Sequence, residues 1–294
     1  MPVYPVAAGK ASCRVAGCAC RDRMPRYPSD LTDQQWELLE PEARAVMAEL
    51  RTSPAGAPMR HDLRAMLDAI GYVTRYGIEW RALPADFPPW TAVYAFFERW
   101  SARDLPRRLA DRLRGRIRIA CGRAELPTAA VIDAQTVRGA DTVDAASAGY
   151  DAGKKTKGRK RNIATDCLGL LLMVTVTAAS MQDRDAAHRL LALLRERFST
   201  ISLVWADGGY AGRLVVWANQ VLRLAVTIIK RSDNVVRHRR LVRDYERRPE
   251  HHEAMAWWAT VTIMTRRLTQ ELTGSPPPPR WGKPRPSRHA EPAA

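Results

Sequence analysis

The first part of the chain carries apolar residues at helical spacing. Thr32, with Gln35 three residues further on, forms a capping pair that predicts the start of a helix. From residue 60 to 76 apolar positions recur at i, i+3, i+4 and i+7, and Gly77 stands at the C-cap position. A further helix is predicted over 90–100. Short turns between these helices predict a compact bundle of helix-turn-helix character.

From residue 127 the pattern changes to short apolar runs rich in β-branched residues. Strands are expected over 129–137, 159–166, 170–177, 201–206 and 224–229, and helices over 185–198, 213–222 and 250–272. Three strands that can pair as a meander, followed by helix, strand, helix and strand, predict a mixed sheet flanked by helices. The fold class is therefore α/β, preceded by a small all-α region.

Composition divides the chain into four parts. Residues 1–26 mix Pro, Gly, Cys and Arg without a period and are interpreted as a loose N-terminal extension. The helical domain is placed at 27–123 and the α/β domain at 127–272. Residues 273–294 are Pro-rich and basic, which is typical of a disordered tail.

The charge balance indicates a polyanionic partner. The chain has 47 Lys+Arg against 31 Asp+Glu, a formal net charge of +16, and only seven of the cations are Lys. Arginine matches phosphate geometry bidentately, although an arginine-rich coding bias accounts for part of the count. Eight arginines lie within 103–123, either on a solvated linker helix or on a helix that follows phosphates.

No segment resembles a membrane span or a secretory leader. The longest apolar run, 168–179, is well short of the ~20 residues that a span needs. The cysteines are odd in number: Cys13, Cys18, Cys20, Cys121 and Cys167. Because the first three lack the C-x₂-C spacing of zinc sites, we interpret all five as reduced thiols of a cytoplasmic protein.

Two aspartates are candidates for metal-assisted chemistry. Asp133 lies in the middle of the first predicted strand, where an ionised carboxylate needs a partner or a metal. Asp207 ends the fourth strand, just before Gly208 and Gly209; such an Asp often only opens a turn. If the two strands are neighbours, the two carboxylates lie at the edge where α/β sheets bind ligands. Separated by roughly 4–8 Å, they can then hold divalent cations between them.

A basic run, GKKTKGRKR, precedes the second predicted strand. It contains six cations, Lys154, Lys155, Lys157, Arg159, Lys160 and Arg161. A solvated hairpin is one interpretation. In so basic a chain, with two strand-end carboxylates nearby, we favour a DNA-binding role for these residues through phosphate contacts.

Five motifs together resemble a known family. They are YPSDLTDQQWELLEP, GIEWRALPADFPPWTAVYAFFERW, VIDAQTVRGA around Asp133, GRKRNIATDCLGLLLMVTVTAASMQDRDAA, and WADGGYAG around Asp207. In this order they resemble the IS5-type DDE transposases of bacterial insertion sequences, over residues 27–267. The resemblance implies an RNase H-like catalytic domain, a helical domain that binds the element's terminal repeats, Asp133 and Asp207 as the first two acids of the DDE triad, and Mg²⁺, or Mn²⁺ in its place, as cofactor.

The third acid of the triad has no counterpart in this sequence. The family carries it on a W-V-V-E-R-T-F-like helix before the closing R-R-L-x-x-D-Y-E text, and here Val236 runs directly into Arg237. The resemblance therefore implies an internal deletion that removed the catalytic Glu. Glu246, Glu250 and Glu253 remain as candidates, but each has an ordinary explanation as a surface or helix first-turn charge.

Three functions remain open from the sequence. The first is a transposase acting on terminal repeats and target DNA, as a homo-oligomer on double-stranded DNA in the cytoplasm, associated with the nucleoid. The second is a catalytically dead DNA-binding remnant. The third is a two-metal nuclease without strand transfer. The missing Glu predicts that the present chain is catalytically impaired.

Overall fold

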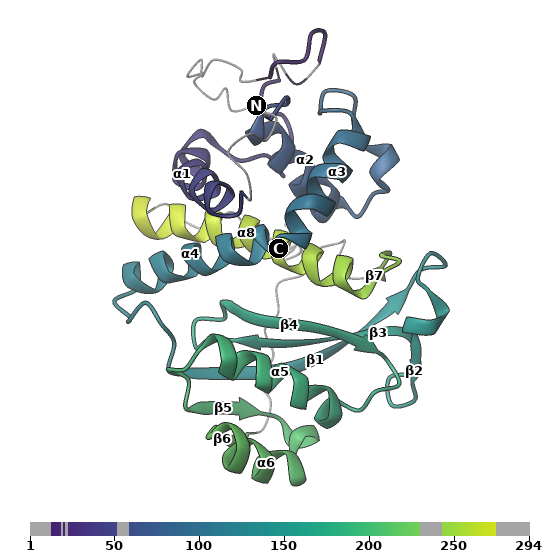
Figure 1. Cartoon of the computed structure of the whole chain (residues 1–294), viewed down its shortest axis with the longest axis vertical. Coiled ribbons are helices and arrows are strands. Elements are labelled where there is room, and N and C mark those ends of the chain that lie inside the picture. The colour runs from purple at the N-terminus through teal and green to yellow at the C-terminus, as the bar shows by residue number, and fades with distance from the viewer. Residues whose placement is uncertain (1–12, 19, 21–22, 52–58, 230–242, 275–294) are drawn as a thin grey trace, which may run out of the picture.

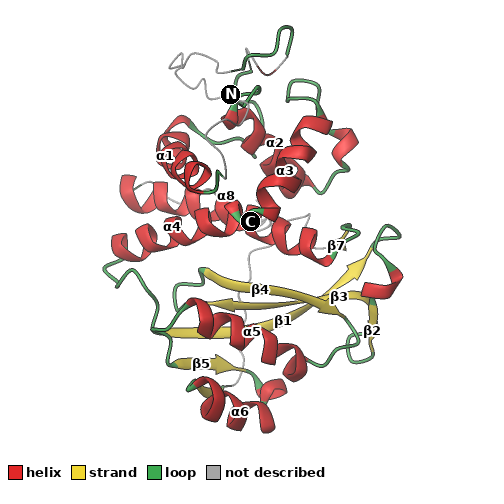
Figure 2. Cartoon of the chain, viewed as in Figure 1, coloured by secondary structure: helices red, strands yellow, loops and turns green. Residues whose placement is uncertain are grey.

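The computed structural model describes residues 13–18, 20, 23–51, 59–229 and 243–274. Helices occupy one half of the molecule and a sheet with two covering helices occupies the other (Figure 1). The predicted order of elements is confirmed, with helices first and a mixed sheet after them (Figure 2). None of the described helices combines the length and apolar content that crossing a membrane requires.

Among the described residues, four α-helices form the N-terminal region. They are α1 (Asp33–Glu49), α2 (Leu63–Tyr76), α3 (Trp90–Ala102) and α4 (Leu105–Ala120). The predicted capping box is present at the start of α1, where Thr32 and Gln35 exchange side-chain to backbone hydrogen bonds. Gly77 ends α2 with φ 67°, a left-handed conformation that glycine adopts without steric cost.

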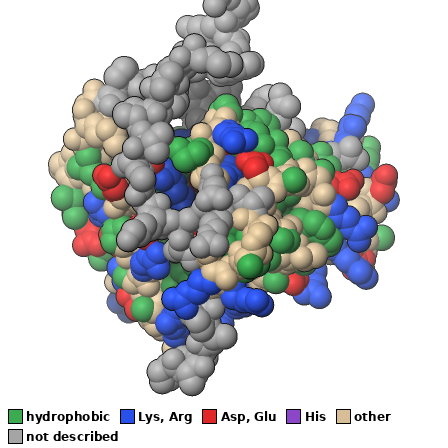
Figure 3. All heavy atoms as spheres, turned by 90° about the horizontal axis from the view of Figure 1, so that it is seen from above, with side chains coloured by type: hydrophobic (Ala, Val, Ile, Leu, Met, Phe, Trp, Pro, Cys, Tyr) green, Lys and Arg blue, Asp and Glu red, His purple; other side chains and the backbone are tan. Residues whose placement is uncertain are grey.

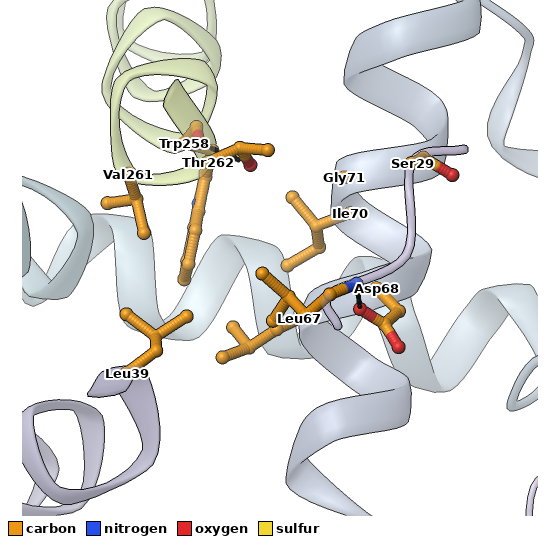
Figure 4. Close-up of a pocket in the computed structure, with 10 residues that line it drawn as sticks. Ser29, Leu39, Leu67, Asp68, Ile70, Gly71, Trp258, Val261 and Thr262 are labelled. Carbon is orange, nitrogen blue, oxygen red and sulfur yellow. Dashed lines mark hydrogen bonds between the residues drawn. The ribbon is translucent and has the colours of Figure 1, made fainter. Parts of the chain in front are cut away.

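The last helix, α8 (Pro249–Thr273), packs against the N-terminal helices. Leu39 of α1, Leu67 and Ile70 of α2, and Trp258 and Val261 of α8 converge around a small cavity, shown in Figure 4. One hydrophobic core holds these five helices together with residues of strand β4 (Leu171–Ala178). The two ends of the chain thus contribute to the same helical layer.

A buried ion network anchors the described part of the N-terminal extension. The guanidinium of Arg23 lies 2.7 Å from a carboxylate oxygen of Asp30 and 3.2 Å from one of Asp68. Asp68 also accepts the backbone N–H of Leu31 at 2.9 Å. Full burial, with a smaller effect from the nearby Asp30 charge, raises the pKa of Asp68 from 3.8 to about 7. The segment around Arg23 is therefore part of the folded structure.

We expect Asp68→Asn to remove a decline in stability between about pH 4 and pH 7. In this window the folded chain retains a proton on Asp68 that the unfolded chain has released, so rising pH favours unfolding by about 1.4 kcal/mol per unit of pKa shift. Urea unfolding of both proteins at several pH values measures the difference. An equal pH dependence in the two proteins contradicts the raised pKa.

The sheet is mixed and is built around strand β1. Its strands are β1 (Ala129–Gly139), β2 (Gly149–Asp151), β3 (Thr156–Thr165), β4 (Leu171–Ala178), β5 (Leu203–Ala206), β6 (Ala225–Ile228) and β7 (Arg243–Asp244). Strands β1, β3 and β4 pair antiparallel as the predicted meander, and β5 and β6 extend the sheet in parallel on the other side of β1. The predicted α/β fold class is confirmed.

One face of this sheet is covered by α5 (Asp183–Arg197) and α6 (Arg213–Leu222). Leucines of α5 share one buried hydrophobic core with Ala130 and Ile132 of β1 and with Val204 and Ala206 of β5. Alternate residues of β1 and β5 therefore point away from these helices. The chemistry discussed below lies on that opposite face.

Candidate active site

Asp133 lies in the middle of β1 and points away from α5 and α6. Its neighbours Ile132 and Ala134 are buried in the core beneath those helices, whereas Asp133 is half-buried. Its Oδ1 accepts the backbone N–H of Ala134 at 2.8 Å. Because solvent reaches this face, an ionised carboxylate costs less here than it does in a strand buried on both sides.

Asp207 follows β5 directly, in extended conformation with φ −79° and ψ 177°. Its Oδ1 accepts the backbone N–H of Gly209 at 2.9 Å and caps the short turn Gly208–Tyr210. Asp207 therefore does open a turn. This role orients the carboxylate at the end of the strand, so the two interpretations of Asp207 are compatible.

The strand register places the two aspartates side by side. Strands β1 and β5 pair in parallel, with Val131 opposite Trp205. Asp133 and Asp207 each lie two residues further along, so they share the face that Val131 and Trp205 occupy. Adjacent strands lie about 4.8 Å apart, so this register agrees with the separation of roughly 4–8 Å expected for carboxylates that share metal ions.

A buried cation lies on the same face. Gln135 is two residues beyond Asp133, and Arg161 is paired with it across strands. Arg161 donates from its guanidinium to Gln135 Oε1 at 2.7 Å. Burial lowers the pKa of Arg161 to about 10, so it remains charged at neutral pH. The charge of Asp244 favours the protonated form of Arg161.

The donor set suits a hard divalent cation. Carboxylate oxygens are the ligands that Mg²⁺ and Mn²⁺ prefer, and Mg²⁺ is commonly held by one or two carboxylates. Within the residues that the structure describes, Asp133 and Asp207 are not joined by a further Asp, Glu, His or Cys in a group of ligands. Two protein ligands fit one ion better than the pair of ions used in phosphodiester chemistry.

The three candidate glutamates lie elsewhere. Glu253 Oε1 accepts the backbone N–H of Val176 on β4, which is separated from β1 by β3, and burial raises its pKa. Glu246 is buried beside the short strand β7, which pairs with the far end of β1 at Arg138 and Gly139. Glu250 is exposed in the first turn of α8. None of these positions points to a role beside Asp133.

The structure separates the predicted DNA-binding run into two groups. Lys154, Lys155 and Lys157 are exposed in and beside the turn between β2 and β3. The other three, Arg159, Lys160 and Arg161, are buried, and their side chains bind partners inside the protein. The burial of these three side chains argues against direct contact with DNA phosphates, because β3 turns them into the fold.

Arg159 has a structural role that the sequence did not reveal. It is fully buried and donates to Asp244 Oδ2 at 3.0 Å and to the backbone carbonyls of Glu246 and Arg247. Asp244 also pairs with His252 Nδ1 at 2.8 Å. The network joins β3, β7 and α8, so it connects the sheet to the helical layer.

The arginine-rich helix α4 is a packing helix. Its arginines that pair with carboxylates of the chain are Arg107, Arg112, Arg114, Arg116 and Arg118. Arg118 is buried against Asp166 at 2.5 Å, and Arg114 donates to the carbonyl of Leu171 on β4. Arg103, Arg108 and Arg123 remain exposed, so packing accounts for only part of the arginines within 103–123. Seen from the helical end, Lys and Arg side chains are interspersed with acidic ones (Figure 3).

Two family models match the chain. The model described as "Transposase DDE domain" matches residues 125–272, just over half of the chain, and the model described as "Putative transposase of IS4/5 family" matches residues 31–110. No curated protein and no solved structure gives a significant match. The α/β half is a DDE transposase domain, whose sheet and flanking helices are consistent with an RNase H-like fold. The chain belongs to the DDE transposases, and its N-terminal helices are similar to those of putative IS4/5 transposases.

Proposed function

We propose that this chain derives from the transposase of an IS5-type insertion sequence and acts on double-stranded DNA in the cytoplasm. In this proposal its N-terminal helices bind the element's terminal repeats, and Asp133 and Asp207 hold Mg²⁺ or Mn²⁺. The observation that carries the proposal is the parallel register of β1 and β5, which brings the two aspartates of the family's motifs to one face.

Each residue of the site has a definable task. A divalent cation held by this pair would activate an attacking oxygen or stabilise a leaving one during strand cleavage. The backbone N–H groups of Ala134 and Gly209 orient the two carboxylates. Arg161 is buried and does not reach the DNA itself, but its positive charge on the same face would attract an approaching phosphate from a distance.

The exposed lysines lie next to this site. Lys154 Nζ donates to the backbone carbonyl of Ala134, the residue after Asp133, at 3.3 Å. Lys155 and Lys157 are exposed beside it. We therefore retain these three lysines as the proposed DNA-binding residues, because from this turn they can hold the phosphate backbone beside the carboxylates.

Replacing Lys154, Lys155 and Lys157 together by Ala is expected to weaken binding to all duplexes alike. The slope of log K against log salt should become shallower by roughly one unit per lost phosphate contact. Fluorescence anisotropy with an element-end duplex and an unrelated duplex, over a range of NaCl concentrations, measures both effects. Arg184→Ala, an exposed cation on α5, is the control. A loss confined to the element end contradicts the phosphate role.

We further propose that the chain is catalytically impaired. An internal deletion between Val236 and Arg237 accounts for the missing third acid; these two residues lie outside the described part of the chain. With only two carboxylates, a second metal ion lacks a protein ligand. If the reacting groups are misplaced by about 1 Å as a result, the rate of cleavage falls ~10²-fold. A DNA-binding remnant that competes with an intact transposase is therefore the second candidate function, favoured by the positions of Glu246, Glu250 and Glu253.

A combined binding and cleavage assay tests the proposal. Labelled duplexes carrying the ends of the encoding element are incubated with the chain in Mg²⁺ and then in Mn²⁺. We expect a specific shift of the element ends with at most trace cleavage. Efficient cleavage without preference for the element ends would favour a plain nuclease. If the chain bound none of the duplexes, a transposase lineage that still recognises DNA would be contradicted.

A further inference from the structure

Four potential metal ligands meet outside the carboxylate site. They are Cys13, Cys18, Cys20 and His61, and their sulfur and ring-nitrogen atoms all lie within 4.8 Å of one another. Among the described residues, no other group of three or more potential metal ligands comes this close together. Cys13 and Cys20 are buried, and Cys18 and His61 are partly exposed.

The four ligand atoms lie close enough together to share one ion, with the sulfurs of Cys18 and Cys20 moving apart to reach tetrahedral spacing. With Zn–S bonds of about 2.3 Å and Zn–N bonds of about 2.0–2.1 Å, ligand atoms around tetrahedral zinc lie roughly 3.5–3.8 Å apart. Cys18 Sγ lies 3.6 Å from His61 Nδ1 and 2.9 Å from Cys20 Sγ. The second distance exceeds a covalent S–S bond, and all three cysteines are free thiols.

The backbone on both sides holds these ligands in place. His61 directly precedes Asp62, the N-cap of α2, so its position is set by a long helix. The cysteine segment runs beside it, with the N–H of Arg14 donating to the carbonyl of Arg60 at 2.7 Å. A turn between Val15 and Cys18, with Gly17 at φ 68°, brings the chain back toward Cys20.

We propose that Cys13, Cys18, Cys20 and His61 bind one structural Zn²⁺ ion. Three thiolates and one imidazole complete a four-coordinate shell, which leaves no position for water or substrate and so indicates a structural centre. The site would join the N-terminal segment to α2, where Arg23 already bridges Asp30 and Asp68. It lies outside the carboxylate site and is independent of the proposed function.

This proposal goes beyond the interpretation of the cysteines as reduced thiols, which set a zinc site aside. The spacing C-x₄-C-x-C lacks the C-x₂-C pair that identifies common zinc sites. The fourth ligand, His61, is 43 residues from Cys18 and becomes a neighbour only through folding. A disulfide between two of these cysteines leaves the third thiol and the imidazole beside it unexplained.

Metal content of the untagged full-length chain tests the proposal. Purified under reducing conditions with Zn²⁺ in the growth medium, the chain should contain one zinc per molecule by mass spectrometry. Co²⁺ added to the metal-free chain should produce the absorption bands of tetrahedral thiolate-bound cobalt. Removal of zinc by a chelator should lower the melting temperature.

Matched variants assign the ligands. Cys18→Ser and His61→Ala should each lower zinc affinity by at least about 100-fold, whereas His61→Cys, which restores a fourth ligand, should retain the metal. Cys121→Ser and Cys167→Ser are controls that should leave zinc content unchanged. A folded wild-type chain without zinc, or one zinc retained in both Cys18→Ser and His61→Ala, overturns the proposal.

Discussion

Inserting a segment of the W-V-V-E-R-T-F type between Val236 and Arg237 is expected to raise Mg²⁺-dependent cleavage of the element ends by at least about 100-fold. The inserted Glu would supply the ligand that Asp133 and Asp207 lack. The inserted turns would also replace helix that covers the sheet in the family, so stability should increase. Initial rates on labelled end duplexes measure the effect.

The matched control is the same insertion with Gln in place of its Glu. It should fold as well as the active insertion and remain as slow as the present chain. In the present chain, Glu246→Gln, Glu250→Gln and Glu253→Gln should leave trace cleavage unchanged. Robust cleavage by the unaltered chain that one of these three substitutions abolishes would show that the third acid is already present.

Arg159→Ala is expected to lower the free energy of unfolding by about 3–5 kcal/mol, the usual cost of removing one partner of a buried ion pair. The substitution leaves Asp244 buried with a weaker set of partners and removes the donor to the carbonyls of Glu246 and Arg247. Urea unfolding, followed by circular dichroism, measures the change.

Lys157→Ala is the comparison, because Lys157 is exposed two residues earlier on the same strand. Its effect on stability should stay within about 0.5 kcal/mol, and it should instead weaken DNA binding. Unchanged stability of Arg159→Ala, together with a shallower salt slope for DNA binding, would contradict the buried role of Arg159.

Local patterns in the sequence predicted most of the elements correctly. The capping pair Thr32 and Gln35, Gly77 and the β-branched runs are short-range signals, and their helices and strands occur within a few residues of the expected ends. The sequence predicted that Asp133 and Asp207 lie together only if their strands are neighbours, and the parallel pairing of β1 and β5 meets that condition.

The partners of charged and metal-binding residues could not be predicted in this way. In the sequence, Arg159 is one cation of a basic run. Its burial depends on an ion pair with Asp244, which lies 85 residues later in the chain. The same holds for His61 and the cysteines, whose proximity depends on how an irregular segment meets α2. Such partners are set by tertiary packing, which neither periodicity nor spacing records.

The central claim is that Asp133 and Asp207 form one divalent-cation site, and iron-directed cleavage of the protein chain tests it most directly. With Fe²⁺ in place of Mg²⁺, and ascorbate and peroxide added, the backbone should be cut near both Asp133 and Asp207, and excess Mg²⁺ should suppress both cuts. We predict that Asp207→Asn alone abolishes the cuts at both strands, since the ion is shared. If Asp207→Asn removed only the cut near residue 207, or if neither strand were cut in the unaltered chain, the shared site would be contradicted.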